Sequence, residues 1–438
     1  MSGGNKKKKK KSSAPPMPQV RFSQCMIVKN EEKNIEKALS WAKSIAFEQI
    51  VVDTGSTDRT VEIAKKMGAK IFHFEWINDF GAAKNYAIEQ ASGNWIAFLD
   101  ADEYLSQTDT KKLSALLRRI MSDPKQKEDS LAVECPWVNI DDNGDPIGIL
   151  SQIRVFRNIP SIRYIGKIHE YLSLVSNTVV RADDIAIMHT GYSETAFKET
   201  GKTNRNIELL RKATADNPGD YNLKAYLGEA LLGMEDEHSP AEAEELFFEV
   251  ISPSSNAGSE FRKKAYAHLL EARLERGDFL DSEELSRRAL VDFPGDIDLG
   301  YYLGFALNKK KEYSEAYEVL QESEKRLLGS KALDESIRIS ANPSLLFTQL
   351  AAAAQGLGEV EGLVKYAAIT LSVDKSQDGI LAVYIATLLK HGVSEDEVVA
   401  LLSAIYDMNS SQDLVLLANA SAKYGASSLA RRFADMVK

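Results

Sequence analysis

The chain contains 438 residues, of which 44% are hydrophobic and 27% charged, as is typical of soluble globular proteins with two or three domains. Its formal net charge is −10, and residues 1–24 contribute +7, so the remainder carries −17 and lacks the basic surface that nucleic-acid binding requires. The two cysteines, Cys25 and Cys135, lie in apolar stretches and exclude a disulfide framework, which favours a reducing, cytoplasmic location.

The N-terminal segment carries six consecutive lysines, Lys6 to Lys11, followed by serines and prolines. No apolar segment follows the lysines, so the pattern is not that of a secretory signal. We predict a disordered basic tail over residues 1–19, with weak contact to an anionic membrane surface or to nucleic acid as the alternative. No apolar run approaches the roughly 18 residues that a membrane-spanning helix requires.

Between Val20 and Asp102, short β-branched runs alternate with helical patterns, which predicts an α/β domain with a parallel sheet. The expected strands span residues 22–28, 49–53, 70–74 and 95–100, and the expected helices lie near 34–46, 57–67 and 80–91. Parallel sheets bind ligands at the carboxyl ends of their strands. The residues that follow each strand are therefore the candidate site residues.

Residues 104–200 follow a less regular pattern, with a helix expected near 111–121 and strands at 131–137 and 152–156. Asn143-Gly144 predicts a hairpin turn, because these residues adopt the positive φ that such turns need. The acids beside this turn lack the ligand spacing of a calcium-binding EF-hand. We assign residues 20–203 to one domain.

Amphipathic helices dominate residues 204–438, which we assign to a second, all-α domain. A 34-residue period relates Leu269 to Leu303 and Gly277 to Lys311, and Leu-Gly recurs at 227–228 and 303–304. This period is typical of tetratricopeptide repeats, in which each helical hairpin buries its apolar face by stacking on its neighbours. We expect this array to present a concave surface to a partner.

A pair of carboxylates, Asp100 and Asp102, follows the fourth expected strand. In extended backbone this spacing points both side chains to one face, where they can share a divalent cation. Such an ion is suited to binding a diphosphate and stabilising it as it leaves. An acidic, solvated turn is the alternative interpretation.

Other polar residues follow the earlier strands, but no glycine-rich dinucleotide motif or P-loop does. Asp53 can accept a hydrogen bond from a base or a ribose, while Ser56 lies where it can cap the next helix. Lys84 and Asn85 lie in the helix before the carboxylate pair, where phosphate and metal would meet, although Lys84 also fits an ordinary surface lysine. Asp79 precedes that helix, where helix capping is its alternative role.

Three segments carry a family resemblance: CMIVKNEEKNI at 25–35, VVDTGSTDRT at 51–60 and NDFGAAKNYAIEQASGNWIAFLDADE at 78–103. Over residues 20–193 the chain resembles family 2 glycosyltransferases with the GT-A fold, a Rossmann-like nucleotide-sugar domain. It is most similar to the bacterial subset that is fused to tetratricopeptide repeats, which includes peptide S-glycosyltransferases of the sublancin type.

The resemblance implies an inverting transfer of a sugar from a nucleotide-diphosphate donor, by preference UDP-linked. The acceptor would be a protein, peptide or glycan presented by the repeats. Asp100 and Asp102 match the family's metal-binding D-x-D motif, which implies Mn²⁺ or Mg²⁺ as the cofactor. Donor contacts are expected for Asn30, Glu32, Asp53, Ser56, Asp79, Lys84, Asn85, Asp100, Ala101, Arg154 and Arg157.

Residues 154–158 and 166–170 resemble downstream motifs of the same subset. A neutral imidazole can complete a metal shell and a carboxylate can deprotonate an acceptor, so we predict His169 as a metal ligand and Glu170 as the catalytic base, acting with Asp102. Both His169 and Glu170 also fit structural roles. The alternative bases are Glu103, Asp79 and Glu134, and His189 is expected at the domain junction or near the metal.

Two other classes of protein fit part of the pattern. A nucleotidyltransferase also uses carboxylate-bound metal, but it would carry a glycine-rich basic loop after the first strand, where residues 29–32 read Lys-Asn-Glu-Glu. A non-catalytic scaffold would combine the repeats with a degenerate domain. The joint presence of Asp53, Asp100 and Asp102 argues against degeneracy.

Overall fold

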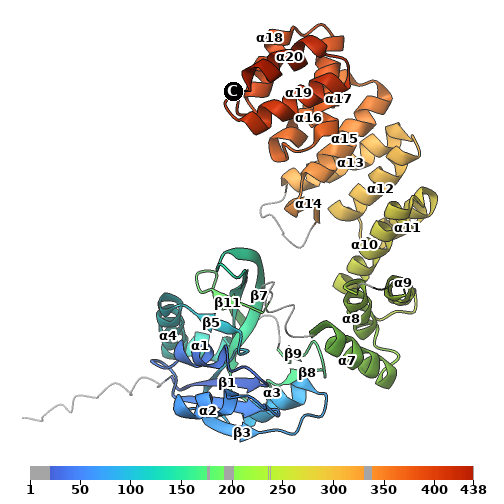
Figure 1. Ribbon diagram of the computed structural model, residues 1–438. Coiled ribbons are helices and arrows are strands. Elements are labelled where there is room, and N and C mark those ends of the chain that lie inside the picture. The colour runs from blue at the N-terminus through green and yellow to red at the C-terminus, as the bar shows by residue number, and fades with distance from the viewer. Residues whose placement is uncertain are drawn as a thin grey trace, which may run out of the picture. The chain divides into compact units, whose positions relative to one another are not determined.

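The computed structural model describes residues 20–174, 178–191, 202–234, 236, 238–329 and 338–437 (Figure 1). The predicted basic tail lies outside these residues. Contacts within the chain divide it into two compact units, Met1–Asn217 and Pro218–Lys438. Within the described part of the chain, none of the helices has the length and apolar character needed to cross a membrane.

The N-terminal unit is built on a mixed sheet with the strand order β3-β2-β1-β4-β7-β6-β11-β5, to which β10 adds by pairing with β6. The first four strands in this order are parallel, and β7 runs antiparallel to both β4 and β6. β5 follows β4 directly in the chain but lies at the far end of the order, so the sheet curls. The strands are β1 (Phe22–Val28), β2 (Glu48–Asp53), β3 (Lys70–His73), β4 (Trp95–Phe98), β5 (Glu103–Leu105), β6 (Ala132–Ile140), β7 (Pro146–Arg157), β10 (Val179–Arg181) and β11 (Ile187–His189), with β8 (Tyr164–Ile165) and β9 (Tyr171–Leu172) forming a separate pair.

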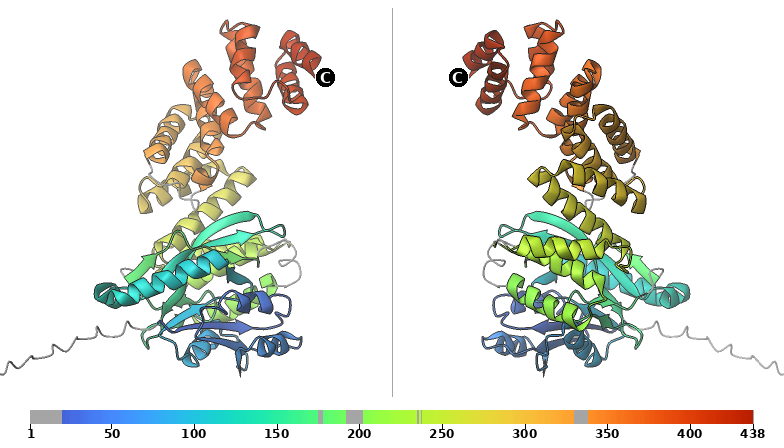
Figure 2. Two further views of the ribbon diagram at one scale, coloured as in Figure 1. Left: turned by 90° about the vertical axis from the view of Figure 1, so that its left-hand side faces the viewer. Right: turned by 90° about the vertical axis from the view of Figure 1, so that its right-hand side faces the viewer.

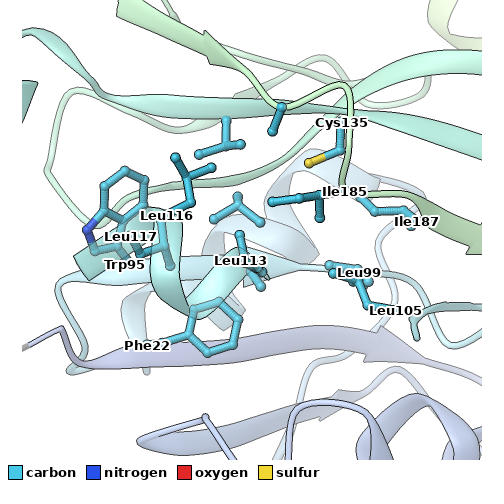
Figure 3. Packing of buried hydrophobic residues seen from close by; sticks show 14 of the residues in the cluster. Phe22, Trp95, Leu99, Leu105, Leu113, Leu116, Leu117, Cys135, Ile185 and Ile187 are labelled. Carbon is cyan, nitrogen blue, oxygen red and sulfur yellow. The ribbon is translucent and has the colours of Figure 1, made fainter. Parts of the chain in front are cut away.

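Helices cover both faces of this sheet, because its strands are apolar on both sides. Along β4, Ile96 and Phe98 pack with α3, whereas Trp95, Ala97 and Leu99 pack with α4. Figure 3 shows Leu113, Leu116 and Leu117 of α4 in this second cluster, with Phe22, Trp95 and Leu99. The helices of the unit are α1 (Ile35–Ser40), α2 (Thr60–Lys66), α3 (Phe80–Glu89), α4 (Gln107–Ser122), α5 (Pro124–Asp129) and α7 (Lys202–Asp216).

The C-terminal unit consists of helical hairpins that stack one after another (Figure 2). Gly277 and Lys311, which the 34-residue period relates, both have positive φ, at 83° and 66°. Gly304 lies where a Cβ atom would come within 2.4 Å of the Leu320 side chain, so the close approach of two helices explains the recurring glycine. The helices are α8 (Tyr221–Leu232), α9 (Ser239–Val250), α10 (Ser259–Arg276), α11 (Phe279–Asp292), α12 (Ile297–Lys309), α13 (Tyr313–Gly329), α14 (Arg338–Ala341), α15 (Ser344–Leu357), α16 (Val360–Val373), α17 (Asp378–Lys390), α18 (Glu395–Ser403), α19 (Ser411–Lys423) and α20 (Ser427–Met436).

The predicted fold class, an α/β domain followed by all-α repeats, is confirmed. Two element boundaries differ from the expectation in ways that affect the site. β4 ends at Phe98, so Asp100 and Asp102 lie in a turn and not in extended backbone. β7 begins at Pro146, six residues before the expected strand, and pairs with β6 as one long hairpin.

Candidate active site at the turn between β4 and β5

The turn that joins β4 to β5 carries both predicted metal-binding carboxylates. The Glu103 amide donates to the Asp100 carbonyl at 3.0 Å, which closes the turn over residues 100–103. The expected extended geometry of Asp100 and Asp102 is therefore wrong, because the chain must reverse here to reach β5. Ala101, between them, packs its side chain into the core with Met26 and Val28.

Glu103 holds this turn in place from inside the protein. Its side chain is 1% exposed, and its Oε2 accepts a hydrogen bond from the Asp100 amide at 3.0 Å. Its Oε1 accepts from Trp137 Nε1 at 2.7 Å and from Arg154 Nη2 at 2.6 Å. With both oxygens engaged and no exposure, Glu103 positions the turn and is unsuited to act as the catalytic base.

Arg154 reaches the turn because β7 is bulged at this residue. Val133 pairs with Val155 and Glu134 pairs with Ile153, so Arg154 is an extra residue between two rungs of the ladder. A bulge of this kind re-aims a side chain and is frequent beside active sites. Arg154 Nη2 thereby lies 3.5 Å from Asp100 Oδ2 as well as 2.6 Å from Glu103.

Lys84 lies on α3 and joins the turn to the segment before β9. Its side chain is only 4% exposed, and its Nζ lies 3.3 Å from Asp100 Oδ1 and 2.8 Å from Glu170 Oε1. Burial would lower the pKa of Lys84, but the charges of Asp100 and Glu170 outweigh burial and raise it above its usual value. Lys84 is therefore a buried, charged group, and the surface-lysine interpretation is wrong.

Asp100 is held in its charged form by its neighbours. Burial raises the pKa of Asp100, but the positive charges of Lys84 and Arg154 outweigh burial and keep it below the usual value. The charge of Asp102 acts in the opposite direction and raises the pKa of Asp100. The two carboxylates therefore disfavour each other's charge, and the cations beside Asp100 outweigh this effect.

Asp102 faces His189 at the end of β11. Asp102 Oδ2 lies 3.5 Å from His189 Nε2, and the His189 ring stacks on Trp137 with centroids 4.1 Å apart. His189 Nδ1 donates to Asn139 Oδ1 at 2.7 Å, which leaves the lone pair of the neutral ring on Nε2. A ring nitrogen and a carboxylate that face each other in this way can bind a common metal ion.

Four carboxylates and two cations make up this cluster, so its formal charge is −2 when His189 is neutral. The carboxylates are Asp100, Asp102, Glu103 and Glu170, and the cations are Lys84 and Arg154. Nowhere in the described ranges do three His, Cys, Asp or Glu side chains form a complete metal-binding group. The predicted set of Asp100, Asp102 and His169 is therefore not assembled, and His169 is an exposed turn residue with φ of 52°.

The polar residues after β1 and β2 bond mainly to each other. The Asn30 amide donates to Ser56 Oγ at 3.0 Å, and Thr57 N donates to Asn30 Oδ1 at 2.8 Å. Glu32 Oε2 accepts from Arg59 N at 3.2 Å. These bonds join the two loops, and the donor-binding roles of Asn30, Glu32 and Ser56 stay predictions.

Asp53 ends β2 and is buried. Its carboxylate accepts hydrogen bonds from the amides of Gly55 and Ser56 at 3.3 and 3.0 Å, and its Oδ2 lies 3.3 Å from His73 Nδ1. The turn that was expected around Asp53 is present. Contact of Asp53 with a base or ribose stays a prediction.

Two residues with predicted donor contacts, Asn85 and Asp79, have structural partners, and their donor contacts stay predictions. Both ends of the Asn85 side-chain amide bond to the backbone of Tyr164, at 2.9 Å each, so Asn85 holds β8 against α3. Asp79 caps α3 by accepting from the Ala82 amide at 2.8 Å, as its alternative role predicted.

Arg157 was placed wrongly in the site. It pairs with Trp95, the first residue of β4, whereas Asp100 follows the last residue of that strand. Its guanidinium lies over the Trp95 ring, and its Nη1 is 3.1 Å from Met121 Sδ. Arg154 and Arg157 looked equivalent in sequence, and the bulge separates their roles.

Glu134 is a poor candidate base. It lies on β6 and forms an ion pair with Arg181 of β10 at 3.3 Å. Among the candidate bases, Glu170 combines partial exposure, at 14%, with an ion pair to the cluster through Lys84.

Trp137 and Asn139 on β6 organise the cluster, and no sequence motif identified them. Their side chains bond to Glu103 and His189 across more than 30 residues of sequence. Trp137 and Asn139 are separated by one residue, which in a strand puts them on one face. That spacing is the one local signal that could have grouped them.

Comparison with known proteins identifies the N-terminal domain. Residues 23–125 match the sequence profile of glycosyl transferase family 2. The chain is 32% identical over 226 residues to a TPR repeat-containing protein of Synechococcus elongatus, covering 48% of this chain and 52% of that protein. It is 27% identical over 294 residues to the SPbeta prophage-derived glycosyltransferase SunS of Bacillus subtilis, covering 63% of this chain and 64% of that protein.

The chain thus spans between about half and two thirds of the length of these curated relatives. Among solved structures, S. aureus TarS in complex with UDP-GlcNAc has a TM-score of 0.35 and 16% sequence identity, covering 67% of this chain and 92% of that chain. The family profile covers β1 to β4, the β4–β5 turn and α4. The chain therefore contains a glycosyl transferase family 2 domain, and helical repeats follow it.

Proposed function

We propose that this chain is a metal-dependent glycosyltransferase that moves a sugar from a nucleotide-diphosphate sugar to an acceptor with inversion at the anomeric carbon. The observation that carries the proposal is the excess negative charge at the β4–β5 turn of a family 2 domain. A cluster with formal charge −2 is stabilised by one divalent cation. A nucleotidyltransferase is disfavoured because the loop after β1 carries no glycine-rich basic sequence.

Asp102 and His189 are the residues best placed to hold such an ion, with Asp100 beside them. Mg²⁺ and Mn²⁺ sites of phosphate-transferring enzymes commonly use one or two protein carboxylates and complete the shell with substrate phosphates. The incomplete ligand set among the described residues fits a site that the donor diphosphate completes. When bound, the ion supplies charge stabilisation to the departing diphosphate.

The chain's own residues supply the remaining chemistry. Lys84, whose pKa is raised by Asp100 and Glu170, is proposed to bind the diphosphate. Glu170 is proposed to accept the proton of the acceptor group as that group attacks the anomeric carbon. Because Glu170 is bonded to Lys84 at 2.8 Å, movement of Lys84 toward the diphosphate would release the carboxylate for this role.

The repeats are proposed to hold part of the acceptor. A cavity of about 500 Å³ in the C-terminal unit is lined by residues of the alternate helices α8, α10, α12 and α14: Glu229, Lys264, Ala267, His268, Glu271, Asp298, Tyr302 and Arg338. Its lining combines charged head groups with a larger apolar surface, which suits an amphipathic chain. A Lys264→Ala, His268→Ala double variant should lower transfer to the acceptor and spare donor hydrolysis.

Donor binding tests the proposal directly. The full chain should gain thermal stability with UDP, UDP-glucose or UDP-N-acetylglucosamine when Mn²⁺ is present, and less without it. Slow release of free sugar should accompany binding of the correct donor. Stabilisation by nucleoside triphosphates with release of pyrophosphate would instead indicate a nucleotidyltransferase, and no response to any nucleotide would indicate a scaffold.

A further inference from the structure

The outer part of β7, residues 146–154, forms an edge of the sheet. β7 pairs with β6 along its length but with β4 only through residues 155–157. No other described strand borders residues 146–154. Between described residues, no further backbone hydrogen bond reaches residues 147–154. In an antiparallel ladder, alternate N–H and C=O groups of such a strand point away from its one partner.

This edge lacks the features that usually prevent pairing with another chain. Protected edges carry charged side chains, above all lysine, or are covered. Residues 146–153 read Pro-Ile-Gly-Ile-Leu-Ser-Gln-Ile and contain no charge, with proline only at the outer end. Ile147, Ile149 and Leu150 are 56%, 49% and 53% exposed. The hairpin projects beyond the rest of the sheet (Figure 1).

The inner end of the edge lies in the candidate active site. Arg154 is the last residue of the stretch that β4 leaves unpaired, and it forms ion pairs with both Asp100 and Glu103. The edge parts from β4 at the bulge, beside the β4–β5 turn that carries Asp100 and Asp102. A chain that pairs with residues 146–153 is therefore led toward the carboxylate cluster.

We propose that the edge of β7 captures the acceptor as an extended polypeptide that adds a strand to the sheet. The inference rests on the proposed function and deepens it, because it makes the acceptor a peptide and not a glycan. Backbone hydrogen bonds would supply affinity with little sequence preference, while the apolar side chains at 147, 149 and 150 would favour apolar residues beside the modified position. Because the edge of β7 leads to the carboxylate cluster, we expect its occupant to be an acceptor and not a second copy of this chain.

The test uses the full chain and a synthetic library of short peptides, each with one central Ser, Thr or Cys. The peptides and, separately, a set of oligosaccharides are incubated with Mn²⁺ and the intact UDP-sugar that the chain was found to hydrolyse. Products are identified by mass spectrometry. Ile149→Lys should lower transfer to peptides about tenfold or more, because the loss of several backbone hydrogen bonds accumulates. Donor hydrolysis should not change, and Phe47→Lys, at a residue that is 53% exposed elsewhere in the same unit, should have no effect.

The best peptide is then methylated at one backbone nitrogen at a time. Strand addition predicts losses that alternate with a period of two residues, because only every second amide faces the edge. Equal losses at all positions, unchanged peptide transfer by Ile149→Lys, or transfer to oligosaccharides alone would overturn the inference and leave the proposed function standing. Conversion of a dimer to a monomer by Ile149→Lys, with peptide transfer unchanged, would likewise overturn it. Absence of donor hydrolysis by the wild-type chain would overturn the proposed function and this inference with it.

Discussion

Two sets of polar residues follow strands of the same sheet, and they differ in how far their charges and hydrogen bonds are balanced. After β1 and β2, Asn30, Ser56 and Thr57 bond to one another and join two loops. After β4, Asp100 and Asp102 belong to a cluster with more carboxylates than cations. The first set makes its hydrogen bonds within the protein, whereas the second carries an excess of negative charge.

The balance of charges and hydrogen bonds distinguishes structural residues from candidate site residues better than the type of residue does. Both sets consist of polar side chains near strand ends, and both lie in segments that resemble family motifs in the sequence. A hydrogen-bonded loop contributes to stability without a ligand, and buried excess charge is costly until a ligand compensates it. We therefore expect substitutions at the β4–β5 turn to affect catalysis and substitutions in the loops after β1 and β2 to affect stability.

The largest effect is expected for Asp102→Asn. The substitution removes a charge that faces His189, and sugar transfer should fall about a thousandfold, the scale seen when one charge-stabilising group of an active site is lost. Steady-state rates, measured with Mn²⁺ and the UDP-sugar that the wild-type chain hydrolyses, would show this fall. Far-UV circular dichroism should be unchanged, and transfer at a comparable rate would contradict the assignment of the turn as the site.

Lys84→Met should cause the largest loss of stability. It leaves Asp100 and Glu170 without their buried cation, which costs about 3 to 5 kcal/mol for pairs of this kind. All four tryptophans lie before residue 138, so their fluorescence during urea unfolding reports on the N-terminal unit alone. Lys112→Met, at a partly exposed ion pair, is the control and should cost less than about 1 kcal/mol.

The strands and the carboxylate pair could be predicted because both are local signals. Alternating β-branched runs predicted β1 to β4, and the acids after Phe98 indicated the candidate site. The geometry of the cluster depends on contacts that local patterns do not encode. The bulge that selects Arg154 over Arg157 exists only in the pairing of β6 with β7.

The choice between two histidines shows the same limit. His169 and His189 both lie in the less regular part of the N-terminal sequence, and the family resemblance favoured His169. The structure places His189 beside Asp102 because β11 pairs antiparallel with β5, which brings residue 189 opposite Glu103. That register is set by the curl of the sheet, which no local pattern of residues indicates.

Glu48 tests the opposite case, a buried carboxylate that the scaffold satisfies fully. Its oxygens accept from Ser23, Ser92 and Lys70, and although burial raises the pKa of Glu48, these hydrogen bonds outweigh burial and lower it from 4.5 to about 2. Because the pKa is lower in the folded state, the stabilisation is present above pH 4.5 and is lost as the pH falls from 4.5 toward 2.

Glu48→Gln should therefore lower the free energy of unfolding at pH 7 by up to about 3 kcal/mol, at 1.36 kcal/mol for each unit of pKa shift. The difference from wild type should shrink when unfolding is measured at pH 3. Glu62→Gln, at an exposed position on α2, should show no such dependence. If the free energies of unfolding of wild type and Glu48→Gln differed by the same amount at both pH values, the packing of the side chain and not its charge would account for the stabilisation.

The smallest effect is expected for Ser56→Ala in the joined loops. Its hydroxyl accepts from the Asn30 amide at 3.0 Å, so its loss should lower the free energy of unfolding by about 1 kcal/mol. If the loops are scaffold, the KM for the donor stays unchanged, since the hydrogen bonds of this region are already made within the protein. A raised KM with unchanged stability would show instead that Ser56 binds the donor, and that a loop complete in its own hydrogen bonds can still belong to the site.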